Sequence, residues 1–227
     1  MTMRGIFITG TDTGVGKTRI AAGLLLALRA RGLRAVGMKP VSCGCTLTPD
    51  GPRHDDALLL RACSSSTDIA YEDINPYAFM PAVSPHLAAA QTGITIEHDK
   101  LRAALGKLSA QADFVVVEGA GGWHAPIGEQ ETMADIARAL ALPVVLVAGV
   151  RLGGLNHALL TRDAIDATGL PLAGWVANVI DPDMPMLTEN IDTLRTRIAA
   201  VLLGTLAYQP HFDGEEVAQH LDVSALL

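Results

Sequence analysis

The chain has 227 residues, a length that fits one α/β domain better than two. Hydrophobic residues make up 49% and charged residues only 18%, which is the balance of a protein with a buried core and excludes a disordered chain. The formal net charge of -7 argues against general binding to nucleic acid or to an anionic membrane, because clustered basic residues usually meet such partners.

The three cysteines and the lengths of the apolar runs indicate in which cellular compartment the protein lies. Cys43, Cys45 and Cys63 are an odd number, and the opening residues MTMRGIFITG contain no apolar signal segment. No apolar run approaches the roughly 20 residues that a membrane helix needs. We therefore expect a cytoplasmic protein. A zinc site is not favoured, since the C-x-C pair is not followed by a second pair at a recognised spacing.

Short apolar runs alternate with segments of helical periodicity along the whole chain, which is typical of βα units around a parallel sheet. In chain order, the predicted strands are residues 5–9, 35–38, 114–117, 143–148, 172–179 and 201–206. Apolar residues at helical spacing predict helices over 18–31, 101–108, 133–140 and 187–198. We expect one α/β domain over residues 1–227, with a mostly parallel sheet and helices on both faces.

The stretch GTDTGVGKT, residues 10–18, follows the first predicted strand and opens the first predicted helix. It resembles the phosphate loop G-x-x-x-x-G-K-[ST], except that its first glycine, Gly10, stands one position too early. In such a loop, Gly14 and Gly16 let the backbone approach an anion closely, and Lys17 adds a cation. Thr18 offers a hydroxyl to magnesium. The third glycine of a dinucleotide fingerprint is missing, so the pattern favours a nucleoside triphosphate.

Charged residues follow two other predicted strands. Glu118 ends the apolar run FVVV. It is either solvated at a tight turn or held by a cation or strong hydrogen-bond donors, and magnesium is the natural cation. Lys39 ends the second strand, beside the first, and is either a second ammonium near the phosphates or an ordinary surface charge. Asp55 and Asp56 are either helix-start carboxylates or one more magnesium ligand, and the residues alone leave both alternatives open.

These motifs occur in one order in a known family. Taken together, GTDTGVGKT, KPV, NPYAF with SPHLAA, VVEGAGGW, LGGLNHALLT and LAGWVAN resemble the dethiobiotin synthetases, the ATP-dependent cyclo-ligases of biotin synthesis. The resemblance runs from residue 5 to residue 206 and explains the early glycine, because the phosphate loop of this family has five residues between its glycines. It implies a homodimer of single P-loop NTPase-type domains with the substrate site at the subunit interface.

The implied reaction joins 7,8-diaminononanoate and CO2 with ATP and Mg2+. One amine forms a carbamate, ATP converts the carbamate to a carbamic-phosphoric anhydride, and the second amine closes the ring. The resemblance also implies roles by position. The implied catalytic residues are Lys17 and Lys39, and the implied magnesium ligands are Thr18, Asp56 and Glu118. ATP would contact Gly14, Val15, Gly16, Lys17, Thr18, Arg19, Glu118, Gly119, Ala120, Gly121, Asn178, Leu206 and Ala207. The substrate would contact Thr13, Lys39, Cys43, Gly153, Gly154, Leu155 and Asn156.

The sequence departs from the family pattern at Cys43, where a serine or threonine is usual, and a thiol is a weaker hydrogen-bond donor. Neighbouring Ser42 is a candidate to supply the hydroxyl instead. The alternative function is a partitioning-type P-loop switch ATPase, but those proteins carry a lysine early in the loop, where this chain has Asp12. We expect Lys39→Ala to lower turnover far more than folding stability.

Overall fold

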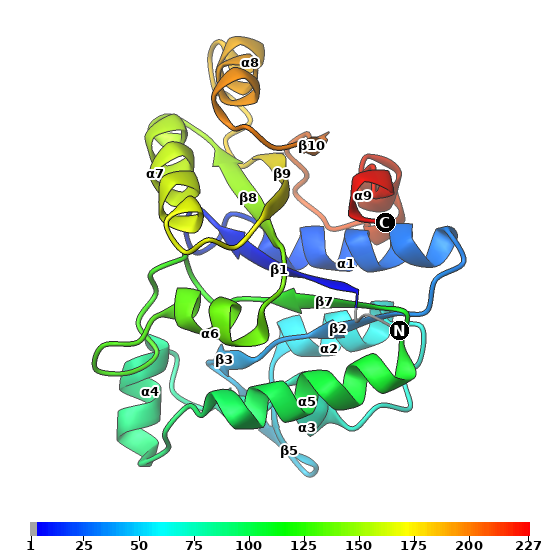
Figure 1. Cartoon of the computed structure of the whole chain (residues 1–227), viewed down its shortest axis with the longest axis vertical. Coiled ribbons are helices and arrows are strands. Elements are labelled where there is room, and N and C mark those ends of the chain that lie inside the picture. Colours follow the sequence, from blue (N-terminus) through cyan, green and yellow to red (C-terminus); the bar gives the residue numbers. More distant parts are fainter. Residues whose placement is uncertain (1–3) are drawn as a thin grey trace.

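A six-stranded parallel sheet forms the centre of the protein, as the computed structural model shows over the residues that it describes, 4–227 (Figure 1). Its order is β10-β9-β8-β1-β7-β2, with every neighbouring pair parallel. The strands are β1 (Gly5–Gly10), β2 (Ala35–Met38), β7 (Phe114–Glu118), β8 (Val144–Val150), β9 (Leu172–Val179) and β10 (Leu202–Leu206). Each lies where the apolar runs predict a strand, so the expected fold class is confirmed.

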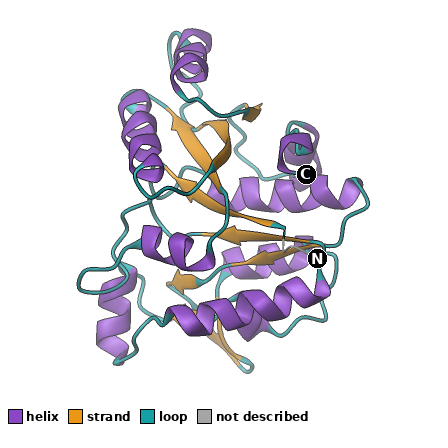
Figure 2. Cartoon of the chain, in the orientation of Figure 1, coloured by secondary structure: helices purple, strands orange, loops and turns teal. Residues whose placement is uncertain are grey.

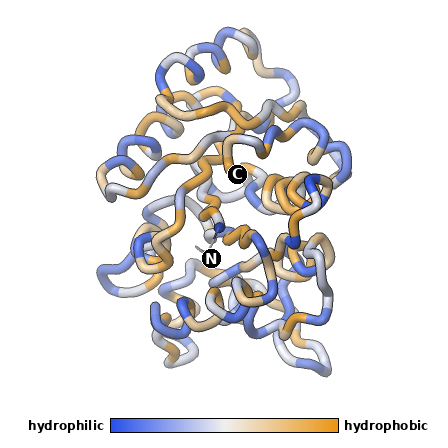
Figure 3. The backbone as a smooth tube through the Cα atoms, turned by 45° about the vertical axis from the view of Figure 1, so that its right-hand side comes forward, coloured by the Kyte–Doolittle hydropathy of each residue, from blue (hydrophilic) through white to orange (hydrophobic). Residues whose placement is uncertain are grey.

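Helices cover both faces of this sheet, because successive side chains of a strand point to opposite faces and both faces are apolar (Figure 2). Ile6 and Ile8 of β1 pack toward α1 (Lys17–Ala30), α2 (Asp55–Cys63) and α9 (Gly214–Gln219). Phe7 belongs to the opposite core, with α5 (His98–Gln111), α6 (Met133–Leu140), α7 (Gly154–Asp166) and α8 (Leu187–Arg197). Figure 3 shows hydrophilic turns mainly on the outer helices.

The segment between β2 and β7 holds two pairs of short strands that the sequence did not predict. β3 (Val41–Cys43) pairs in parallel with β6 (Tyr77–Phe79), and β4 (Thr46–Thr48) forms a hairpin with β5 (Gly51–Arg53). Helices α3 (Tyr71–Ile74) and α4 (Pro85–Thr92) complete this region. Each of these strands has only three residues, which is too short to show a period of two in the sequence.

The end of the chain packs onto the sheet edge. Helix α9 packs against α1 (Figure 1), where Gly23 leaves room for Val217: a Cβ at position 23 would come within 2.3 Å of Val217 Cγ1. Asp222 donates its backbone N–H to the carbonyl of Leu203 at 2.7 Å, and a 3-10 helix, Ser224–Leu226, follows. Among residues 4–227, no helix combines the length and the apolar character that crossing a membrane requires.

Candidate active site

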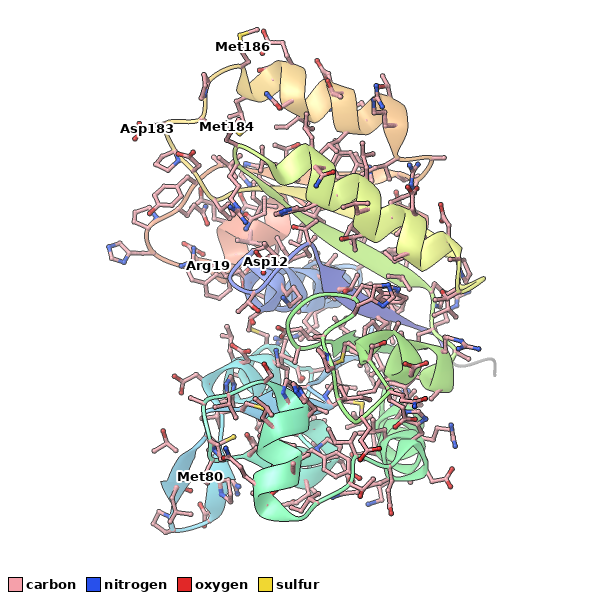
Figure 4. All side chains as sticks on the ribbon, turned by 90° about the vertical axis from the view of Figure 1, so that its left-hand side faces the viewer. Asp12, Arg19, Met80, Asp183, Met184 and Met186 are labelled. Atoms are coloured by element: carbon pink, nitrogen blue, oxygen red, sulfur yellow. The ribbon has the colours of Figure 1, made fainter. Side chains whose placement is uncertain are left out.

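The glycine loop joins the end of β1 to the start of α1, at the edge of the sheet where the strands end. Figure 4 faces this edge and shows Asp12 and Arg19 of the loop region between Met80 on one side and Met184 on the other. Gly14 has φ 77° and Gly16 has φ 90°, a left-handed conformation that glycine adopts without steric cost. No side chain caps α1, so the N–H groups of its first turn are available to an anion.

Val15 anchors this loop in the core. It is 1% exposed, and glycines surround it: a Cβ on Gly10 would lie 2.6 Å from one of its methyl groups and a Cβ on Gly149 would lie 2.7 Å from the other. Its carbonyl oxygen accepts a 2.8 Å hydrogen bond from Asn178 Nδ2. The ends of β1, β8 and β9 therefore hold the loop together, and the early Gly10 serves as part of the Val15 pocket.

A buried ion cluster lies beside the loop. Lys39 follows β2 and is 4% exposed, and its ammonium lies 2.6 Å from the carboxylate of Glu118 and 2.8 Å from that of Asp56. Glu118 ends β7, the strand next to β2, and is 1% exposed. Thr18 donates its hydroxyl to the same Glu118 oxygen at 2.8 Å. The structure thus brings together residues from α1, α2 and two strands.

These charges shift one another's pKa values. Burial, with a smaller contribution from the positive charge of Lys39, lowers the pKa of Lys17 from 10.5 to about 8. Burial also opposes the charged form of Lys39, but the carboxylates of Glu118 and Asp56 outweigh it and raise its pKa. Although burial favours the neutral form of Asp56, Lys39 holds the pKa of this carboxyl below its usual value. Lys39 and Asp56 are therefore a charged pair at neutral pH.

A cavity of about 710 Å³ opens over the loop and the ion cluster. Most of the predicted site residues line it, namely Thr13, Gly14, Gly16, Lys17, Thr18, Arg19, Lys39, Cys43, Asp56, Glu118, Ala120 and Gly121. The ammonium of Lys17 donates to the carbonyl of Asp12 at 2.8 Å, at the rim of the same loop. Gly119, which was also predicted, is not among the residues that line the cavity. It packs against Phe7, and a Cβ at position 119 would lie 3.0 Å from the Phe7 ring.

A second cavity of about 280 Å³ adjoins the other side of the glycine loop. Asn178, Leu206 and Ala207 line it together with Gly14 and Gly16, so the residues predicted to contact adenine lie next to those predicted to contact phosphate. Arg19 also lines both cavities and donates to the carbonyl of Gln209 at 2.7 Å, which ties α1 to the chain after β10. Gln209 was not among the predicted residues, because a backbone contact leaves no signal in residue type.

The other predicted substrate residues lie apart from both cavities. Gly153 precedes α7 with φ 85°, and Gly154, Leu155 and Asn156 form its first turn. Leu152 before them is 84% exposed. The adjacent Arg151 pairs with Asp12 at 3.2 Å, which links this loop to the glycine loop of the same chain.

Cys43 and Ser42 differ in their surroundings. Cys43 is partly exposed in the cavity wall, and burial, with a smaller contribution from Cys45, raises the pKa of its thiol to about 11. Ser42 is 1% exposed and donates its hydroxyl to Asn75 Oδ1 at 2.7 Å. Because this hydrogen is already used, Ser42 does not supply the hydroxyl donor expected of position 43.

The residues present fit a magnesium ion by their chemistry. Thr18, Asp56 and Glu118 offer only oxygen atoms, which are the ligands that Mg2+ prefers. Glu118 Oε2 is buried without a hydrogen-bond partner among the described residues, so one carboxylate oxygen there remains available.

Sequence reasoning missed part of the cavity wall. Residues 82–85 and 125–126 also line the cavity. Both stretches stand in or beside motifs that the sequence contains, SPHLAA and VVEGAGGW, but neither offers a charged side chain that would mark a site.

A parallel sheet with a glycine loop between β1 and α1, a lysine and a threonine at the helix start, and an acid at the end of β7 defines a P-loop protein that binds a nucleoside triphosphate. A sequence profile described as an AAA domain matches residues 4–216. Two solved structures share the fold: a ParA family ATPase from Chlorobium tepidum, with TM-score 0.58 and 13% identity over 99% of this chain and 96% of that one, and MinD from Pyrococcus horikoshii, with TM-score 0.56 and 16% identity over 99% and 89%.

The chain is far more similar in sequence to a second group of proteins than to these two structures. The ATP-dependent dethiobiotin synthetase of Cellvibrio japonicus is 50% identical over 227 residues, covering 100% of this chain and 99% of that protein. The synthetase of Pseudomonas aeruginosa is 51% identical over 226 residues, covering 99% and 98%. The chain belongs to the ATP-dependent dethiobiotin synthetase family. The likeness to ParA and MinD is one of fold alone.

Proposed function

We propose that this chain converts 7,8-diaminononanoate, CO2 and ATP to dethiobiotin, ADP and phosphate. The observation that carries the proposal is the position of Lys39: a buried ammonium in the wall of a cavity that the phosphate loop also lines. A cation held there by Glu118 and Asp56 is suited to an anion that forms beside a triphosphate.

The proposed reaction has three steps. One substrate amine attacks CO2 and loses a proton, which gives a carbamate. A carbamate oxygen attacks the γ-phosphorus of ATP and ADP leaves, which gives the carbamic-phosphoric anhydride. The second amine attacks the anhydride carbon, phosphate leaves, and loss of a proton completes the ring. Each step makes or moves negative charge on oxygen, so catalysis depends on positioned cations more than on acid and base groups.

The two lysines share this work in the proposal. Lys39 stabilises the carbamate and then the transferred phosphoryl group. Lys17, at the start of α1, contacts the phosphates together with the loop N–H groups from Gly14 to Arg19. Mg2+ held by Thr18, Asp56 and Glu118 would neutralise phosphate charge when bound. The support for a magnesium site is the set of oxygen atoms on these three residues, including Glu118 Oε2, which has no hydrogen-bond partner among the described residues.

We propose that the smaller cavity binds adenine between Asn178 and the backbone of Leu206 and Ala207. The support is its continuity with the glycine loop, because Gly14, Gly16 and Arg19 line both cavities.

We propose a cytoplasmic homodimer of single-domain chains in which Gly153, Gly154, Leu155 and Asn156 serve the substrate of the partner subunit. These residues lie outside the cavities of their own chain, and N–H groups at the start of α7 suit a carboxylate. Leu152 and Leu160 expose 84% and 60% of their surface beside this helix start and on α7, as a dimer contact would require. Free Cys43, Cys45 and Cys63 agree with a reducing compartment.

The test is incubation of the purified chain with diaminononanoate, bicarbonate and MgATP, with mass spectrometry of the products. We expect dethiobiotin and one ADP for each product molecule. Folded protein that hydrolyses ATP without forming dethiobiotin would contradict the proposal, and stimulation by DNA or by a protein partner would favour a switch ATPase instead.

A further inference from the structure

Asn75 is a buried polar side chain that the proposed reaction does not use, and it lies directly behind Lys39. It is 3% exposed, in the NPYAF stretch after α3. Its Nδ2 donates to the carbonyl oxygens of Lys39 at 2.7 Å and Tyr77 at 3.3 Å. Its Oδ1 accepts from the hydroxyls of Ser42 at 2.7 Å and Tyr71 at 3.1 Å. All four hydrogen-bonding positions of the amide are therefore in use.

This arrangement specifies an asparagine. Carbonyl oxygens only accept hydrogen bonds, so the amide nitrogen has to face Lys39 and the amide oxygen has to face the two hydroxyls. An aspartate would set a carboxylate oxygen against carbonyl oxygens, and an alanine would leave buried polar groups without partners. An apolar side chain could fill the same volume, but it could not make the four hydrogen bonds of the Asn75 amide.

The hydrogen bonds continue from Asn75 to the other end of the Lys39 side chain. The Tyr71 hydroxyl, which donates to Asn75, accepts the backbone N–H of His54 at 2.9 Å. The His54 ring accepts the backbone N–H of Asp56 at 3.2 Å, at the start of α2. The Asp56 carboxylate meets the Lys39 ammonium at 2.8 Å. Asn75, Tyr71, His54 and Asp56 thus connect the Lys39 carbonyl to the Lys39 ammonium. We call these four residues and Lys39 the lysine ring.

The edge position of β2 explains why Lys39 needs this support. Within residues 4–227, β2 has a neighbouring strand on one side only, so its outer side lacks a ladder of backbone hydrogen bonds. The segment 74–77 takes that place: Lys39 donates its N–H to the carbonyl of Ile74 at 2.7 Å, and Tyr77 donates its N–H to the carbonyl of Pro40 at 3.1 Å. The Lys39 peptide is therefore held on both its N–H and its carbonyl side.

We propose that Asn75 and Tyr71 are positioning residues, which fix the backbone of Lys39 relative to the start of α2 so that its ammonium meets Asp56 in the cavity wall. A lysine side chain has four flexible bonds, and its charge is well placed only when both its backbone and its tip are held. The catalytic consequence rests on the proposed function of Lys39, whereas the lysine ring itself does not.

Two tyrosines provide a matched test. Tyr71→Phe removes one hydroxyl from the lysine ring. Tyr77→Phe removes a hydroxyl that accepts from the Glu97 N–H at 2.8 Å, outside the lysine ring. A cation lies over the aromatic ring of each tyrosine: Arg53 is 4.1 Å from the centroid of the Tyr71 ring, and Lys100 is 4.2 Å from that of the Tyr77 ring. The two variants therefore lose the same atom from similar surroundings.

We expect Tyr71→Phe to lower kcat by about 5- to 10-fold, the effect of one lost hydrogen bond of ordinary net strength, with KM for diaminononanoate changed by less than about twofold. Tyr77→Phe should keep kcat within about twofold of the unsubstituted protein. Equal kcat values for the two variants, or a loss confined to KM, would overturn the positioning role.

A second measurement does not depend on turnover. The NMR signal of the Lys39 ammonium, assigned by its loss in Lys39→Arg, should shift or broaden in Tyr71→Phe and stay in place in Tyr77→Phe. An unchanged signal in Tyr71→Phe would overturn the proposal even if the kcat values differed. If the unsubstituted protein made no dethiobiotin, the proposed function would fail, while this comparison would still decide whether Tyr71 positions Lys39.

Discussion

Asn178 donates a 2.8 Å hydrogen bond from Nδ2 to the carbonyl oxygen of Val15, so the strand that lines the smaller cavity also holds the glycine loop. Gly16 is part of this contact, because a Cβ at that position would lie 2.3 Å from Asn178 Nδ2. Under the proposed function, recognition of the base and of the phosphates is therefore joined through one side chain.

Asn178→Ala should weaken the binding of ATP and of inorganic tripolyphosphate alike, each by about fivefold, because the loop loses a hydrogen bond whichever ligand it holds. Titration calorimetry measures both affinities. Asn190→Ala is a matched control, since Asn190 Nδ2 also donates to a backbone carbonyl, that of Met186 at 2.7 Å, on the exposed helix α8. Loss of ATP affinity with unchanged tripolyphosphate affinity would mean that Asn178 acts on the base alone.

Gly149→Ala should lower the free energy of unfolding by about 1–3 kcal/mol, because its Cβ would lie 2.7 Å from Val15 Cγ1, and Gly10 restricts Val15 on the other side. Gly106→Ala should do the reverse and raise it by about 1 kcal/mol, since position 106 is an exposed site inside α5 with no atom within 4 Å of the new Cβ. Urea denaturation compares the two variants. Changes of the same sign would contradict the assigned role of Gly149.

Lys39→Met should lower the free energy of unfolding by about 3 kcal/mol as well as abolish turnover, because Glu118 is 1% exposed and would keep a buried charge without its partner. The expectation from sequence, that replacing Lys39 lowers turnover far more than folding stability, stays a prediction, to which the buried ion pair adds this loss of stability. The double variant Lys39→Met/Glu118→Gln should recover most of that stability while staying inactive. Chemical denaturation without magnesium tests this, and a double variant less stable than the single one would show that the pair is not the cause.

Cys43 should react slowly with iodoacetamide at pH 8. Its thiol pKa is raised from 9.0 to about 11, mainly by burial, so the thiolate form is scarce below that pH. The greater nucleophilicity of a more basic thiolate offsets part of this, which leaves a rate about tenfold below that of an ordinary thiol. Mass spectrometry should show the rate increasing with pH up to about 11, and no labelling at this position in Cys43→Ser. A rate that levels off near pH 9 would contradict the raised pKa.

Local sequence features predicted most of the fold. The six strands of the sheet stand in apolar runs, and GTDTGVGKT stands between a strand and a helix, so periodicity and glycine placement were sufficient to find them. The short strands β3 to β6 and the packing of α9 on α1 were not predictable in this way, because they are stabilised by neighbours distant in the sequence.

The candidate site also has features that the sequence predicts and features that only the tertiary structure shows. The sequence by itself determined that a phosphate loop exists, that acid and lysine side chains follow the neighbouring strands, and to which family the chain is similar, because these depend on residue type and spacing. Only the tertiary structure decided that Lys39 meets Glu118, which lies 79 residues away, that Asn178 holds Val15, and that Asn75 closes the lysine ring. The physical reason is strand pairing: β2 lies beside β7, β8 lies between β1 and β9, and β3 pairs with β6, and these pairings bring residues distant in the sequence within hydrogen-bonding distance.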